Sequence, residues 1–172
     1  MEIKEFIELS VGQWFAQRTT YQLQEEKADN SKSEITLEML SQDNSELVKI
    51  CQKHQIEPNL TIATKSSWDN SVDWGKAKET GFNLLILVPD TQNQQVGKLL
   101  TGNLTQQKIG HYQMGEDEAL TLIVEEGNNH TSERLWFASE NLRLRTSLFK
   151  NNKGFSTTAF YSEIRRIVQA KT

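Results

Sequence analysis

Short segments in which apolar and polar residues alternate, separated by polar turns, run along most of this chain. Residues 33–40 (SEITLEML) are the clearest case, because every second residue from Ile35 to Met39 is apolar. A period of two is typical of strands with one buried face. About ten such segments predict an all-β fold, an antiparallel sheet closed into a barrel. The expected strands are residues 12–23, 33–40, 59–67, 81–89, 95–101, 110–114, 119–126, 132–139, 141–149 and 154–166.

Two segments have helical spacing instead. Residues 2–9 repeat apolar residues every three or four positions, and Gly12 follows them. Residues 43–56 carry an apolar stripe that Asn44 or Ser45 is able to cap. The polar stretches 24–32 and 68–80 are expected to be loops.

Length and composition exclude several classes of protein. At 172 residues the chain has the length of one domain, and we expect a single barrel domain over residues 1–172. No run approaches the ~20 apolar residues of a membrane helix, and the N-terminus lacks the apolar stretch of a secretory signal, so the expected location is the cytoplasm. A net charge of −4 argues against nucleic-acid binding. Cys51 is the single cysteine and the three histidines lie far apart, so neither a disulfide framework nor a metal site is expected.

Charged residues occupy strand positions that alternation directs inward. We expect Trp14 to face the core near one end of the barrel, and alternation then sends Arg18 inward with it. A barrel of eight to ten strands is able to hold one small ligand. An inward guanidinium needs an anionic partner, because an unpaired buried charge costs several kcal/mol.

The segment 141–149 raises the same question. Leucines alternate along one face of it, and Arg143, Arg145 and Ser147 lie on the other. In one interpretation the leucines face the core and the arginines face water. In the other, the arginines line a polar cavity.

Three longer motifs resemble a known family. They are SVGQWFAQRTTY at residues 10–21, ERLWFASENLRLRTS at 133–147, and GFSTTAFYSEIRR at 154–166. Together, and in this order, they resemble the S/U-type phycobiliprotein lyases, the CpcS/CpeS family. The second motif is long and unusual in composition, whereas Gly12-x-Trp14 is shared with lipocalins generally.

The resemblance implies a fold and a function. These proteins are similar in fold to lipocalins and fatty-acid-binding proteins, with a ten-stranded barrel and a short helical insertion. They bind a linear tetrapyrrole, phycocyanobilin or phycoerythrobilin, and attach it through a thioether bond to a cysteine of a phycobiliprotein subunit. No metal cofactor is implied. The implied partners are the tetrapyrrole, the apo-phycobiliprotein subunit, which supplies the attacking thiol, and a second copy or a paired relative.

The implied site residues match the chemistry of such a pigment. Guanidinium groups bind the propionates bidentately, Glu133 or Glu163 accepts hydrogen bonds from pyrrole N–H groups, and indoles contact the conjugated rings. A carboxylic acid protonates the ring system as the thiolate adds, and Glu163 is the candidate. The expected ligand-binding residues are Arg18, Trp68, Trp74, Glu133, Trp136, Arg143, Arg145 and Ser147, and the expected catalytic residues are Glu163 and Arg143.

Two other functions remain open from the sequence. The chain is alternatively a bilin-binding chaperone or partner subunit without transfer activity of its own. It is also, alternatively, a lipocalin-like carrier of another small carboxylate ligand. Clustered arginines and tryptophans favour a dianionic conjugated ligand over a lipid with one carboxylate.

Overall fold

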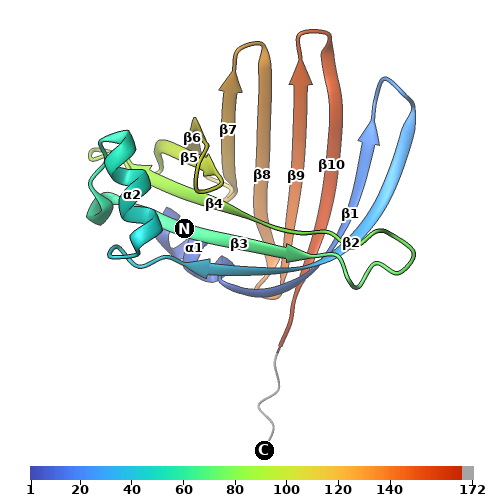
Figure 1. Ribbon diagram of the computed structural model, residues 1–172, viewed down its shortest axis with the longest axis horizontal. Coiled ribbons are helices and arrows are strands. Elements are labelled where there is room, and N and C mark those ends of the chain that lie inside the picture. The colour runs from blue at the N-terminus through green and yellow to red at the C-terminus, as the bar shows by residue number, and fades with distance from the viewer. Residues whose placement is uncertain (168–172) are drawn as a thin grey trace, which may run out of the picture.

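Ten antiparallel strands close into one barrel in the computed structural model, which describes residues 1–167 (Figure 1). Each strand pairs with its neighbours in sequence, and β10 closes the ring by pairing with β1. The barrel expected from the alternating pattern is therefore confirmed. The strands are β1 (Gly12–Gln22), β2 (Lys27–Met39), β3 (Ile62–Asp69), β4 (Thr80–Pro89), β5 (Val96–Gly102), β6 (Gln107–Met114), β7 (Leu120–Glu126), β8 (Asn129–Ser139), β9 (Leu142–Asn151) and β10 (Gly154–Arg165).

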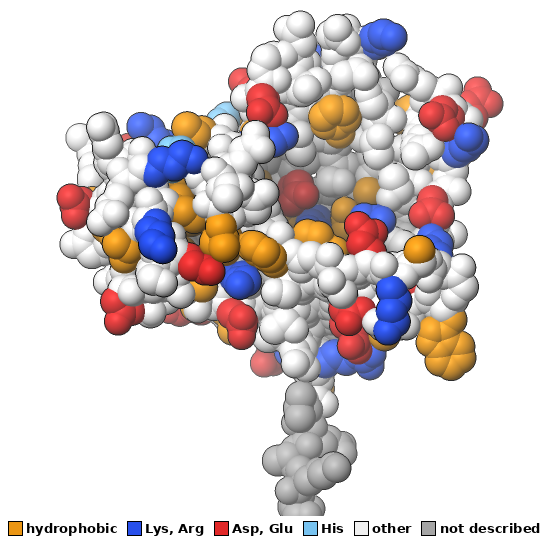
Figure 2. Space-filling model, in the orientation of Figure 1, with side chains coloured by type: hydrophobic (Ala, Val, Ile, Leu, Met, Phe, Trp, Pro, Cys, Tyr) orange, Lys and Arg blue, Asp and Glu red, His pale blue; other side chains and the backbone are white. Residues whose placement is uncertain are grey.

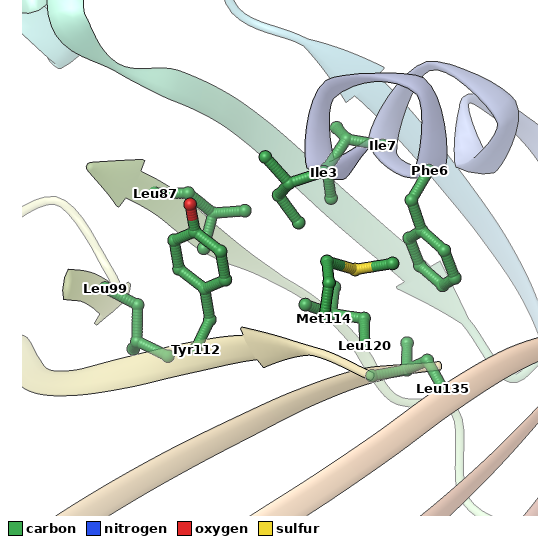
Figure 3. Close-up of a cluster of buried hydrophobic side chains, with 9 residues drawn as sticks. All are labelled: Ile3, Phe6, Ile7, Leu87, Leu99, Tyr112, Met114, Leu120 and Leu135. Carbon is green, nitrogen blue, oxygen red and sulfur yellow. The ribbon is translucent and has the colours of Figure 1, made fainter. Parts of the chain in front are cut away.

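Helix α1 (Ile3–Ser10) closes one end of the barrel interior. Its buried side chains, Ile3, Phe6 and Ile7, pack against strand residues that point inward (Figure 3). Burying these side chains contributes roughly 1.5–3 kcal/mol each. The core therefore fills one end of the barrel and leaves the other end free to form a cavity. The strand residues of this cluster are Leu87, Leu99, Tyr112, Met114, Leu120 and Leu135.

Helix α2 (Ser45–His54) covers the outside of β3, β4 and β5. Asn44 caps it, because its Oδ1 accepts hydrogen bonds from the backbone N–H groups of Glu46 (3.0 Å) and Leu47 (3.1 Å). A short 3₁₀ helix, Pro58–Leu60, follows it. Cys51 is fully buried on the face of α2 that packs against the barrel, and burial raises the pKa of its thiol. Within residues 1–167, no helix combines the length and the apolar character needed to cross a membrane.

Strands take up most of one predicted loop, 24–32, and only the ends of another, 68–80, of which residues 70–79 are a loop as predicted. Strand β2 begins at Lys27, so most of the polar stretch 24–32 pairs with β1, and Trp68 lies in β3. Composition misleads here because both faces of these strand ends are polar: one faces solvent and the other faces the cavity. Continuous backbone pairing in the barrel outweighs the low strand propensity of Asp and Asn.

The buried Tyr112 makes the stability of the barrel depend on pH in the alkaline range. Its hydroxyl donates to the Gln94 carbonyl oxygen (2.9 Å), and burial, with Asp90 adding to it, raises the pKa to about 12. Above the unfolded value near 10 the unfolded chain loses this proton while the folded chain keeps it, so stability falls as pH rises from about 10 to 12. We expect Tyr112→Phe to remove about 2–3 kcal/mol of that decline, measured by urea unfolding at pH 9 and pH 12. An equally steep decline in the variant would contradict the assignment.

Candidate ligand-binding site

A cavity of about 580 Å³ occupies the barrel on the side away from α1. It opens to the surface, and Figure 2 shows this opening as a hollow in which basic, acidic and hydrophobic side chains meet. Its volume is in the range of small-molecule sites. Two glutamates and two arginines gather on β8, β9 and β10, and the rest of the wall mixes apolar residues with polar ones, among them Arg18, Ser33, Ser66 and Asn83. The apolar lining includes Ile35, Leu85, Leu99, Leu122 and Val124.

The arginines of β9 point into this cavity. Arg143 is 4% exposed and Arg145 lines the same wall, whereas Leu142 and Leu144 alternate onto the outer surface of the strand. The interpretation in which these arginines face water is therefore wrong. The leucines lie on the outside because this strand buries its polar face, the reverse of the usual arrangement.

Glu163 forms ion pairs with both Arg143 and Arg145. The register of β10 against β9 sets Glu163 opposite Arg143. The carboxylate is fully buried, its Oε2 accepts a 2.6 Å hydrogen bond from Arg143 Nε, and its Oε1 lies 3.1 Å from Arg145 Nη2. Glu133, on β8, adds a longer contact of 3.8 Å to Arg145. The cluster is thus a buried network of alternating charge rather than an isolated cation.

Burial and charge act in opposite directions on the two arginines. Desolvation lowers the pKa of Arg143, and Glu163 only partly offsets it. Desolvation also acts on Arg145, but Glu133 and Glu163 outweigh it and raise the pKa of that guanidinium. Both groups stay cationic, since the guanidinium pKa starts far above neutrality. The wall is therefore able to attract anionic groups.

Aromatic rings fix the orientation of the guanidinium groups. The Arg145 guanidinium lies 3.8 Å from the centre of the Tyr161 ring, and that of Arg143 lies 4.9 Å from Trp14. Trp14 is fully buried, and its indole N–H donates to the Ser10 carbonyl oxygen (2.9 Å). Trp14 is therefore a core residue, as the sequence predicts. Its ring also packs against the guanidinium group of Arg143.

Two atoms of the network are buried with no hydrogen-bond partner among the residues described. They are Arg145 Nε, a donor, and Glu163 Oε1, an acceptor. Buried polar atoms are nearly always hydrogen-bonded in native proteins. Glu163 Oε1 has the 3.1 Å ion pair with Arg145 instead, and both atoms lie beneath the surface of the cavity wall.

Other predicted residues also line the cavity. Arg18 is an exposed residue of the lining, and its Nε donates to Ser31 Oγ (3.0 Å). Trp68 and Glu133 lie in the lining as well. The structure therefore brings together in one cavity Arg18, Trp68, Glu133, Arg143, Arg145 and Glu163.

Three predicted residues lie elsewhere. Trp74 is 92% exposed in the loop 70–79. Trp136 lies on the outer face of β8, in a shallow depression beside Arg134, and the lining includes its neighbour Leu135 instead. Ser147 shares the inner face of β9 with Arg145, but it is not part of the described cavity lining.

Sequence reasoning missed several lining residues. Tyr161 is two residues from Glu163 on β10, so alternation alone indicates that the two share a face. Asn83 and Thr101 give a weaker signal, a single polar residue near the end of an apolar run. Within residues 1–167, no group of three or more His, Cys, Asp or Glu side chains is arranged to hold a metal ion.

The family model described as CpeS-like protein matches residues 2–166, nearly the whole described chain. The chain belongs to the CpeS-like family. The chain is 40% identical over 169 residues to a protein of Thermosynechococcus vestitus named chromophore lyase CpcS/CpeS, covering 96% of this chain and 93% of the relative. It is 34% identical to the phycocyanobilin lyase subunit CpcS of Picosynechococcus, covering 95% and 86% of the two chains.

A solved structure of the CpeS-like family has the same fold. The S-type phycobiliprotein lyase CPES of Guillardia theta superposes with a TM-score of 0.85 at 28% identity, covering 98% of this chain and 95% of that one. The family expected from the three sequence motifs is therefore confirmed, and so is the barrel. The expected enzyme class, a bilin lyase, is the class that the names of these CpeS-like relatives carry.

Proposed function

We propose that this CpeS-like chain binds a linear tetrapyrrole in the barrel cavity and attaches it through a thioether bond to a cysteine of a phycobiliprotein subunit. The names of its relatives support the reaction class. The observation that carries the proposal is the network of Arg143, Arg145 and Glu163 on the cavity wall. It places cations and a carboxylate on the wall of a cavity whose volume suits a small molecule.

The chemistry of a linear tetrapyrrole matches this wall. Its two propionates suit the guanidinium forks of Arg18, Arg143 and Arg145. Its pyrrole N–H groups suit the carboxylate of Glu133, which is one-third exposed on the same wall. Trp68 offers a flat apolar face for the conjugated rings. A fatty acid would use the cations but not this carboxylate.

The attacking thiol in this proposal belongs to the acceptor. Cys51 belongs to α2, between that helix and the outside of the barrel, fully buried and with a raised thiol pKa, so it is unable to reach the cavity. The acceptor thiolate adds to the exocyclic ethylidene carbon of the pigment, and a C–S bond replaces its C=C π bond. The proton lost by the thiol is balanced by one that the tetrapyrrole gains, and Glu163, with Arg143 beside it, is the candidate relay. The protein contributes mainly by fixing pigment conformation and position.

A binding and transfer assay tests the proposal. Phycocyanobilin and phycoerythrobilin are titrated separately into the protein, and a red-shifted, sharpened visible band reports binding. Apo-phycobiliprotein subunits are then added, and covalent product is detected on a denaturing gel by zinc-enhanced fluorescence. Binding with transfer supports the lyase. Binding without transfer to any subunit supports a chaperone or partner subunit, and no binding of either pigment would overturn the cavity assignment.

Gly81 provides a test of the Trp68 contact. A Cβ at Gly81 would lie 2.7 Å from Trp68 Cε2, so an alanine there forces the indole to move. Overpacking of this kind costs about 1–3 kcal/mol, and we expect Gly81→Ala to weaken pigment binding by about tenfold. Absorbance titration measures the effect. In a Trp68→Ala background the same substitution should have little further effect. A full additional loss there would show that Gly81 acts by another route.

A further inference from the structure

Asn83 on β4 and Thr101 on β5 form a polar pair on the cavity wall. Asn83 Nδ2 donates to Thr101 Oγ1 at 2.9 Å, and both half-buried residues line the cavity. Their neighbours on the inner faces of the same strands are Leu85 and Leu99. A polar pair set beside apolar wall is costly to bury unless its hydrogen-bonding groups find partners.

The pair retains hydrogen-bonding groups of both kinds, and the Asn83 amide also keeps its second N–H. The bond between them uses one amide N–H and one hydroxyl lone pair. The Asn83 carbonyl oxygen is thus still able to accept a hydrogen bond, and the Thr101 O–H is able to donate one. A lactam presents an N–H next to a C=O, which is the complementary arrangement.

The pair lies across the barrel from the arginine wall. In the ring order β1-β10-β9-β8-β7-β6-β5-β4-β3-β2, β4 is five strands from β9 in both directions, and β5 is five strands from β10. Arg143 and Arg145 are on β9 and Glu163 is on β10. Asn83 and Thr101 are therefore diametrically opposed to the arginine wall, and further polar residues of β2 and β3, such as Ser33 and Ser66, lie on the wall between them.

A linear tetrapyrrole has matching geometry when it is coiled. Its propionates are on the two middle rings, and its lactams are the two end rings. In a coiled, ring-like conformation the propionates stand on one edge and the lactams on the opposite edge. We propose that Asn83 and Thr101 bind a terminal lactam of a coiled linear tetrapyrrole whose carboxylates face the arginine wall. This inference rests on the proposed function and adds to it a second contact region and a pigment conformation.

Isosteric variants test the lactam contact. Thr101→Val and Asn83→Leu keep side-chain volume and remove the hydrogen-bonding groups, whereas Thr101→Ser keeps the hydroxyl. Thr146→Val is the matched control, because Thr146 lies on the outer face of β9, outside the cavity. The probe is phycocyanobilin. Its Kd is measured by absorbance titration, and the visible circular dichroism of the bound pigment reports a single coiled form.

The expected result is a Kd about three- to tenfold higher for Thr101→Val and for Asn83→Leu, with smaller circular dichroism in both. Thr101→Ser and Thr146→Val should match the wild type. If Asn83→Leu fails to fold, the Thr101→Val and Thr101→Ser pair decides. Wild-type Kd and circular dichroism in Thr101→Val would overturn the lactam contact and leave the proposed function standing. Failure of the wild type itself to bind phycocyanobilin would instead remove the proposed function, and the lactam contact with it.

Discussion

Replacing Arg143 with Met is expected to lower the free energy of unfolding by about 3–5 kcal/mol. Glu163 has no exposed surface, and Arg143 Nε donates the 2.6 Å hydrogen bond to its Oε2. Without that guanidinium the buried carboxylate keeps only its contact with Arg145. Urea unfolding followed by tryptophan fluorescence measures the change. The same variant should bind pigment about 10- to 100-fold more weakly, because a charge-assisted hydrogen bond contributes about 1.5–3 kcal/mol.

A double variant separates the two effects. Replacing a buried ion pair by apolar side chains of similar size is often neutral for stability. Arg143→Met with Glu163→Leu should therefore recover much of the lost stability but none of the pigment binding. Arg134→Met is the control, since its pair with Asp117 is exposed and should be worth less than about 1 kcal/mol. A single Arg143→Met variant as stable as the wild type would refute the structural role of the pair.

Glu163→Gln is expected to slow transfer of bound pigment by about 10²–10⁴-fold, the usual contribution of general acid–base catalysis. The substitution keeps the volume of a fully buried side chain and removes its charge. Transfer is measured in a single turnover, with protein saturated with phycocyanobilin and then mixed with an apo-subunit. Saturation separates the chemical step from weaker binding.

Glu133→Gln is the matched control for this measurement. Glu133 lies on the same wall, but its side chain is one-third exposed and 3.8 Å from Arg145, so we expect a much smaller effect. Transfer at the wild-type rate by saturated Glu163→Gln would exclude Glu163 as the proton relay. Equal losses in both variants would indicate that the charge of the wall matters rather than one carboxyl group.

The period-two pattern predicts much of the site because the barrel obeys it closely. The pattern predicts that Arg18 points inward once Trp14 is assigned to the core. It also places Arg143 and Arg145 on the same face of their strand. The sequence leaves two orientations of β9 open, because the leucines on one face alternate as regularly as the polar residues on the other. Only the closed ring decides between them, since it sets the polar face toward the cavity.

The features of the site that the sequence does not predict depend on long-range strand register or on loop conformation. The pairing of Glu163 with Arg143 joins residues twenty positions apart and follows from the β9–β10 register. Residues 135–137 are all apolar, so alternation is unable to choose which of them faces inward, and Trp136 lies outside. Trp74 depends on the path of the loop 70–79, which no short-range pattern fixes.

The contacts of Arg165 have a consequence for when the site comes into existence. This residue of the last strand donates to the carbonyl oxygens of Leu9 (2.6 Å) and Val11 (2.8 Å), and its guanidinium lies 4.2 Å from the centre of the Trp14 ring. The end of α1 is thus fastened by a residue of β10 that lies 154 positions from Val11 and 156 from Leu9. Glu163 belongs to the same strand. The closed floor and the Glu163 side of the wall therefore form in one step, when β10 pairs with β1 and completes the ring.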